Sequence, residues 1–107
     1  MPETARDAQF AIVFEYRLPR DGAASFEQEY GADGRWARFF SRDPAYLGTE
    51  LWAFEDDAGR YLVVDRWASG DAYAAFRARF REEYERRSAE TASLYGTERI
   101  VGRVVRR

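Results

Sequence analysis

An aspartate and a tryptophan stand two residues apart in the stretch VVDRWASGDAYAAF, residues 63–76. The first half of this stretch is typical of a buried strand, in which Asp65 and Trp67 point to the same face. A buried carboxylate without a partner is costly, so we expect Asp65 either to pair with Arg77 or Arg38 or to serve as a general base with a raised pKa. We expect Trp67 either to fill the core or to close a pocket.

Two further side chains could contribute to a site near Asp65. Arg77 follows Tyr73 by four residues, on one face of a predicted helix. Its charge would either neutralise a phenolate or another anionic substrate, or remain a surface charge. Tyr16, on another predicted strand, offers a hydroxyl that either donates a hydrogen bond or packs. The candidate catalytic residues are therefore Asp65, Tyr16 and Arg77. The expected pocket wall is aromatic and consists of Trp67, Trp36, Phe40, Tyr73 and Phe14.

The residue types that are missing exclude several classes of chemistry. The sequence has no Cys, His, Lys or Asn, and all 17 basic residues are arginine. Without Cys there is no thiolate nucleophile or iron–sulfur ligand, and without His the usual triad base and the commonest haem ligand are absent. Without Lys there is no Schiff base. We therefore expect no metal site.

Hydrophobic periodicity predicts the elements that position these residues. The order is β-α-β-β-α-β, with Gly48 as a possible bulge in the second strand. Two glycines in GADG should break the first helical region. The aromatic residues that follow form either a wall that the glycines allow to move or part of a plain core. Ile100, Gly102 and Val104 should share one face of the last strand. The predicted strands are 10–17, 46–55, 61–68 and 97–105, the helical regions are 22–41 and 70–89, and 90–96 is ambiguous.

This order predicts a single α+β domain over residues 1–107, with a ferredoxin-like fold. The sheet would be four-stranded and antiparallel, with both helices on one face, and residues 1–8 would be flexible. Val13, Leu62 and Val64 then lie on the uncovered face. An apolar sheet face needs a partner, so we expect a homodimer whose sheets pack face to face. The alternative is partial shielding by the chain termini.

The net charge and the hydropathy pattern limit the classes of partner that we expect for this chain. The net charge is −2 and the pI is about 5.2, which disfavours nucleic acid. RNA-recognition domains share the predicted element order, but YLVVDRWA lacks their basic-Gly-aromatic pattern. No apolar run is long enough to span a membrane, and the N-terminus lacks a signal-peptide core, so we expect a cytoplasmic protein.

Three stretches resemble the antibiotic biosynthesis monooxygenase family of the dimeric α+β barrel superfamily. They are FEQEYGADGRWARFF (26–40), YLGTELW (46–52) and GRYLVVDRWASGDAYAAFRARFREEY (59–84). The resemblance implies a dimer with a pocket between helices and sheet in each subunit. It also implies oxygenation without metal or flavin, on phenolic polyketides, quinols or, in one branch, haem.

The sequence departs from the haem-degrading branch of that family. That branch uses an Asn, a Trp and a His, whose places here are held by Tyr16, Trp67 and, near the His, Arg77. Polyketide-oxidising members also place an Asn in the pocket, and this chain has none. The resemblance therefore favours a cofactor-independent monooxygenase acting on a phenolic or quinol-type molecule. The alternative is a non-catalytic dimer of the same fold that binds a small molecule or another protein.

Overall fold

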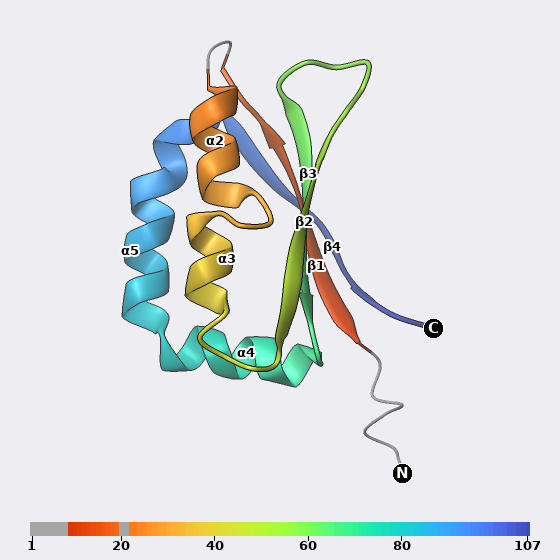
Figure 1. Ribbon diagram of the computed structural model, residues 1–107, viewed down its shortest axis with the longest axis vertical. Coiled ribbons are helices and arrows are strands. Elements are labelled where there is room, and N and C mark those ends of the chain that lie inside the picture. Colours follow the sequence, from red (N-terminus) through yellow and green to blue (C-terminus); the bar gives the residue numbers. More distant parts are fainter. Residues whose placement is uncertain (1–8, 20–21) are drawn as a thin grey trace.

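The computed structural model describes residues 9–19 and 22–107, so the predicted flexibility of residues 1–8 lies outside the described residues. The elements follow the predicted β-α-β-β-α-β order, with the helices gathered on one side of the sheet (Figure 1). The elements are β1 (Phe10–Arg17), α2 (Ala23–Tyr30), α3 (Arg35–Phe40), β2 (Tyr46–Ala53), β3 (Arg60–Trp67), α4 (Gly70–Arg79), α5 (Arg81–Thr91), the 3₁₀ turn η1 (Ala92–Leu94) and β4 (Thr97–Val105).

The four strands form one antiparallel sheet in the order β2-β3-β1-β4. Burial alternates strictly along β1 and β3, which confirms the predicted face of each residue. The ferredoxin-like α+β fold is therefore confirmed. The residues that point to the helices are Phe10, Ile12, Phe14 and Tyr16 on β1 and Tyr61, Val63, Asp65 and Trp67 on β3.

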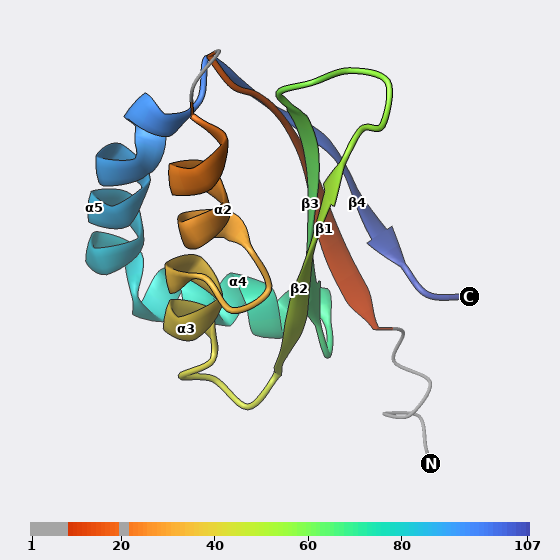
Figure 2. The same ribbon diagram turned by 45° about the horizontal axis from the view of Figure 1, so that its top comes forward.

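The helices differ from the prediction in one respect. The first helical region is broken at residues 31–34 into α2 and α3, as predicted. The second region was predicted as one helix, and this was wrong, because the backbone leaves the helical conformation at Phe80 (φ −110°, ψ 33°). Helix α4 crosses one end of the sheet and α5 runs beside α2 and α3 (Figures 1 and 2). A straight helix could not cover both places. The rings of Phe76 and Phe80 stay in contact across the bend, with their centroids 4.7 Å apart.

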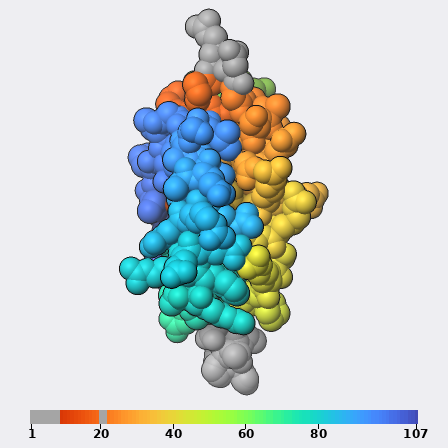
Figure 3. Space-filling model, turned by 90° about the vertical axis from the view of Figure 1, so that its left-hand side faces the viewer, coloured from red at the N-terminus to blue at the C-terminus, as the bar shows by residue number. Residues whose placement is uncertain are grey.

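The core between the two layers is almost entirely aromatic. Its most deeply buried side chains are Trp67, Phe26, Phe39 and Phe76. Helix α5 closes the outer side of this core along its length, next to the segment from α2 to α3 (Figure 3). Aromatic rings bury large apolar areas, so a chain of this size gains a substantial core from few residues.

A bulge changes the faces of the last strand. Val13 of β1 pairs with Gly102, but the next residue, Phe14, pairs with Ile100, so the register shifts by one residue. Ile100 therefore shares a face with Phe14, whereas Gly102 lies on the opposite face with Val13. The prediction that Ile100, Gly102 and Val104 share one face was wrong, because an extra residue in one strand resets the alternation.

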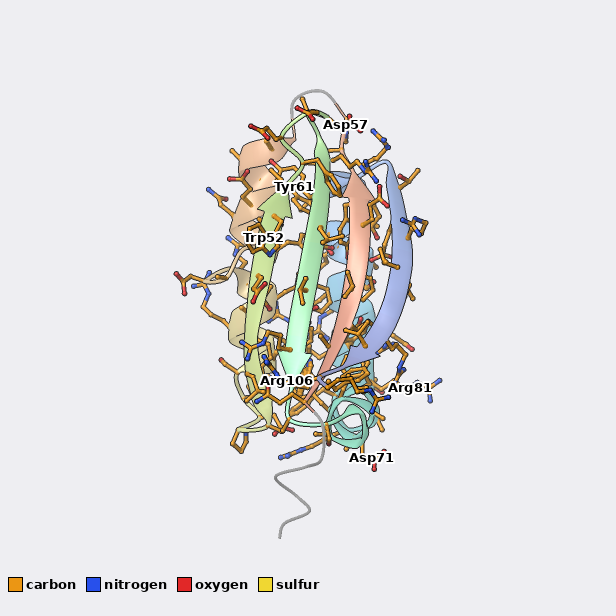
Figure 4. All side chains as sticks on the ribbon, turned by 90° about the vertical axis from the view of Figure 1, so that its right-hand side faces the viewer. Trp52, Asp57, Tyr61, Asp71, Arg81 and Arg106 are labelled. Carbon is orange, nitrogen blue, oxygen red and sulfur yellow. The ribbon has the colours of Figure 1, made fainter. Side chains whose placement is uncertain are left out.

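Among the residues that the structure describes, no helix lies over one face of the sheet (Figure 4). Val13, Leu62 and Val64 lie on this face and are half-buried, and Trp52 is 59% exposed. Charged groups on the same face neutralise one another, because Glu15 accepts hydrogen bonds from Arg60 and Arg99. In the described part of the chain, no helix has the length and apolar character to cross a membrane.

Candidate active site

A cavity lies between the sheet and the helical layer, where the sequence predicted a pocket. It has about 30 Å³ of room for the centres of water molecules, and about 400 Å³ of atom-free space when its open mouth is included. One water needs roughly 10–15 Å³ on the first measure, so the cavity holds about two waters. Its lining residues are Phe14, Tyr16, Tyr30, Trp36, Phe40, Thr49, Val63, Asp65, Tyr84, Ser88 and Glu98.

The mouth of the cavity is polar and lies between α5 and β4. Glu98 of β4 is exposed, and Ser88 and Tyr84 of α5 are half-buried, whereas the other lining residues are buried. The inner wall is aromatic apart from Val63, Thr49 and Asp65. A ligand would therefore enter past a carboxylate and a hydroxyl and reach an apolar interior with one acidic group.

Asp65 is that acidic group. It is 7% exposed, and it accepts a hydrogen bond of 2.6 Å from the hydroxyl of Thr49 on the neighbouring strand. Burial raises the pKa of Asp65 to about 6, and the hydrogen bond from Thr49 lowers it only in part. The carboxyl group therefore changes its protonation state close to neutral pH.

The predicted ion pair of Asp65 with Arg77 or Arg38 is not present among the described residues. Arg77 is exposed on α4 and donates to the hydroxyl of Tyr73 over 3.1 Å. Arg38 donates to the carbonyl oxygen of Gly34. Both guanidinium groups thus stay at the surface, where they keep their hydration, and Asp65 is satisfied by a neutral hydroxyl instead.

Tyr16 lines the cavity, but its hydroxyl already has a partner. The hydroxyl donates to Glu98 Oε2 over 2.6 Å. Burial, with the neighbouring Tyr30 and Glu98, raises the pKa of Tyr16 far above its ordinary value of 10. Tyr16 is therefore a neutral donor that fixes Glu98 at the mouth.

Helix α3 supplies Trp36 and Phe40 to the wall. Within residues 9–19 and 22–107, the buried indole N–H groups of Trp36 and Trp67 have no hydrogen-bond partner, and of the two only Trp36 lines the cavity. Leaving such a donor unpaired costs about 1–3 kcal/mol, which a ligand that accepts from it would recover.

The glycines before α3 have a steric role. A Cβ at Gly31 would lie 2.7 Å from the carbonyl oxygen of Glu27, and one at Gly34 would lie 2.7 Å from that of Glu29. Close backbone approach thus accounts for both glycines without the hinge motion that the sequence suggested.

Three of the predicted site residues are not among those that line the cavity, namely Trp67, Arg77 and Tyr73. Trp67 is fully buried behind the wall, with its ring 5.5 Å from that of Phe40 and 5.6 Å from that of Tyr73. Arg77 lies over the ring of Tyr84 at 3.8 Å, on the outer side of the cavity. These residues form a second layer, which holds Phe40 and Tyr84 in place.

Several lining residues were missed by the sequence analysis. Thr49 contacts Asp65 because the two are directly paired across β2 and β3. Alternation along a single strand cannot reveal a cross-strand partner, because the register must be known first. Tyr30 of α2 and Tyr84 of α5 also line the cavity, and neither was among the predicted site residues. The helical stripe that contains each of them was the available signal.

Fold and cavity together define a one-domain α+β protein with an aromatic cavity that contains a buried carboxylate. Residues 9–86 match the family described as antibiotic biosynthesis monooxygenase (ABM). The chain belongs to this family. No curated protein is significantly similar in sequence.

Solved structures of low sequence identity share the fold. A mutant of SnoaB, a cofactor-independent oxygenase from Streptomyces nogalater, is 21% identical, with 94% of each chain covered and a TM-score of 0.77. A monooxygenase from the gene ActVA-Orf6 of Streptomyces coelicolor, in complex with nanaomycin D, is 19% identical, with 99% of this chain and 95% of that chain covered and a TM-score of 0.68. PA3566 from Pseudomonas aeruginosa is 17% identical, with 92% and 94% covered and a TM-score of 0.66.

Proposed function

We propose that this protein is a cofactor-independent monooxygenase that oxidises a phenolic or quinol-type aromatic molecule with O2, with Asp65 as the general base. The observation that carries the proposal is the burial of Asp65 in an aromatic cavity, where no arginine of the described residues pairs with it. Membership of the monooxygenase family and the fold shared with a cofactor-independent oxygenase support it. A base with a pKa near 6 is ionised at neutral pH and still accepts a proton readily.

The reaction is balanced without an external reductant. Asp65 takes the hydroxyl proton of a dihydroxynaphthalene, and the phenolate transfers one electron to O2. The phenoxyl radical and superoxide combine into a peroxide at a ring C–H carbon, and this peroxide takes up a proton. Asp65, again ionised, takes the C–H proton as the O–O bond breaks and a quinone carbonyl forms. The departing hydroxide takes up a proton and becomes water. One oxygen atom enters the ring and the other becomes water, and the substrate supplies all four electrons.

The unpaired N–H of Trp36 has a place in this scheme. A phenolate in an apolar cavity needs a donor directed at its oxygen, and a donor without a protein partner is free for that task. Phe14, Phe40 and Tyr16 would pack against the ring of the substrate and keep water away from the reactive anion. Arg77 and Trp67 would act from the second layer.

The cavity must widen to admit a bicyclic substrate. Ligand sites for small molecules measure about 300–1,000 Å³. This cavity offers only about 30 Å³ to the centres of water molecules. We infer that binding displaces the residues at the mouth, between α5 and β4, where the lining is least buried. Side-chain rearrangement of this kind is common on binding.

The uncovered sheet face would be the surface of a homodimer. We infer that two copies pack their sheets together through Val13, Leu62, Val64 and Trp52. The internal pairing of Glu15 with Arg60 and Arg99 fits this arrangement, because neutralised charges are less costly to cover than isolated ones.

The small cavity favours one competing function, a non-catalytic dimer of the same fold that binds a ligand or a partner. A protein with that function would leave O2 consumption at its spontaneous rate. The test is O2 uptake by metal-free protein with 1,5-dihydroxynaphthalene, monitored together with formation of 5-hydroxy-1,4-naphthoquinone. We expect the wild type to take up O2 well above the spontaneous rate. In Asp65→Asn we expect this enzymatic rate to fall by about 100-fold or more.

The matched control is Asp71→Asn, which removes an exposed carboxylate from the first turn of α4. This variant should keep wild-type activity. Uptake at the spontaneous rate by the wild type, across a panel of dihydroxynaphthalenes and anthrones, would favour the binding protein.

A further inference from the structure

A chain of hydrogen bonds leads away from Asp65 on the side opposite the cavity mouth. Thr49 donates to Asp65 Oδ1 over 2.6 Å, and Tyr46 Oη lies 2.5 Å from Thr49 Oγ1. A threonine hydroxyl has one proton, and Thr49 gives it to Asp65, so Tyr46 is the donor in the second bond. Thr49 and Asp65 are buried, whereas Tyr46 is half-buried. The chain therefore joins the buried carboxylate to the rim of the protein at the start of β2.

The bulge in β2 is what makes this chain possible. Residues 46 and 49 are three apart, and in a regular strand they would point to opposite faces. Tyr46 pairs with Trp67 and Gly48 with Arg66, so Leu47 is an extra residue. Gly48 has φ +138°, a conformation that other residues rarely adopt. The extra residue places Tyr46 and Thr49 on the same face, in contact with each other.

We propose that Thr49 and Tyr46 form a relay that carries the proton taken up by Asp65 from the cavity to solvent. Hydroxyl groups both donate and accept, so the chain can reverse. Protonated Asp65 donates to Thr49, Thr49 donates to Tyr46, and Tyr46 donates to water. The carboxylate is restored, one proton is released, and both hydroxyl groups stay neutral.

The proposed oxidation requires Asp65 to lose the proton that it takes up, which the relay would allow. Asp65 is required as a carboxylate twice, first for the O–H proton and then for the C–H proton. The proton released between these steps is balanced by the proton that the peroxide takes up. In the described part of the chain, Thr49 is the side chain that is hydrogen-bonded to Asp65, so the relay is the bonded route outward.

The ionisation of the two ends fits a relay of neutral hydroxyl groups. Burial raises the pKa of Asp65 to about 6 and also raises the pKa of Tyr46 above its ordinary value of 10. Tyr46 therefore does not form a tyrosinate intermediate, and the protons must move in concert along the chain.

This inference rests on the proposed role of Asp65, so its test has two parts. In the first part, Tyr46→Phe should lower kcat for 1,5-dihydroxynaphthalene about tenfold and leave KM within about twofold. Tyr61→Phe is the matched control, because it removes a tyrosine hydroxyl that donates to Glu27 over 2.7 Å, away from the cavity. Thr49→Val should behave like Tyr46→Phe, and Thr49→Ser should retain activity. Equal kcat in Tyr46→Phe and Tyr61→Phe would overturn the relay.

The second part needs no substrate. Nuclear magnetic resonance measures the exchange of the Thr49 hydroxyl proton with water in the ligand-free protein. The relay predicts exchange about tenfold slower in Tyr46→Phe than in the wild type, with Tyr61→Phe unchanged, and equal rates in all three would overturn it. An inactive wild type would reject the proposed oxidation, and the exchange rates would then decide the relay by themselves.

Discussion

Asp65 is the residue in which stability and the proposed activity conflict. Its ordinary pKa is 3.8, and burial raises this value to about 6 in the folded protein. The folded state therefore binds the proton more tightly than the unfolded state. The resulting stabilisation is complete below pH 3.8 and is lost as the pH rises through 6. An ionised carboxylate in this position is a cost that a purely structural residue would not impose.

Replacing Asp65 by Asn should remove this pH dependence. The amide oxygen of Asn can still accept from Thr49, so the fold should be retained. At pH 8 the variant should exceed the wild type in free energy of unfolding by about 1–3 kcal/mol, and near pH 4 the difference should vanish. Urea denaturation at the two pH values measures the effect. The same difference at both would show that Asp65 is not buried as an ionised group.

Sequence alone placed Asp65 correctly because alternation along a strand decides which face a residue occupies. Its partner could not be predicted in the same way. An aspartate in an arginine-rich chain suggests an ion pair, but the neighbour across the sheet is Thr49, which the register selects. The register depends in turn on the bulge in β2. Residue-level chemistry was therefore predictable for each strand separately, and contacts between strands were not.

At the scale of elements, the two strand bulges and the bend at Phe80 decide what the cavity contains. The four strands and the broken first helix were predicted from periodicity and glycine positions. The bend at Phe80 was not, because residues 70–89 contain no proline and no interior glycine to mark it. Packing of α4 and α5 on different parts of the sheet produces the bend, and tertiary packing of this kind overrides local propensity.

Gly48 offers a direct test of the β2 bulge. At φ +138°, Gly48→Ala should lower the free energy of unfolding by about 1–3 kcal/mol, although a Cβ there would meet no atom closer than 3.9 Å. Gly102→Ala is the matched control, because Gly102 also lies in a strand, has no positive φ and has open space around it. Chemical denaturation of both variants gives the comparison. A loss as large in Gly102→Ala would mean that the backbone conformation at Gly48 is not the cause.

At the scale of the whole molecule, the asymmetry of the sheet governs assembly. The helices lie over one face, and the other face keeps apolar side chains in contact with solvent (Figure 4). The sequence indicated this asymmetry through Val13, Leu62 and Val64, because apolar residues on both faces of a strand exceed what one helical layer can cover. The partner of the open face follows from physical argument and remains a proposal.

A charge placed on the open face should prevent the proposed dimer. Val64 pairs with Glu50 across the sheet, so Val64→Glu adds a second negative charge beside an existing one. Sedimentation velocity should give about twice the chain mass of 12.5 kDa for the wild type and the single-chain mass for the variant. Ile100→Glu is the control, because Ile100 is also exposed but shares the opposite face with Phe14. A wild-type protein that sediments with the single-chain mass would contradict the proposed homodimer.

The pH dependence of kcat/KM tests the role of Asp65 as the base most directly. The rate of 1,5-dihydroxynaphthalene oxidation, corrected for the spontaneous reaction, should rise with pH through about 6 and then level off, because only the carboxylate accepts the proton. The chain has no histidine, so no imidazole titrates in this range. Asp65→Asn should lack the step. A rate that is flat from pH 5 to pH 8, or a step that the variant retains, would contradict the account.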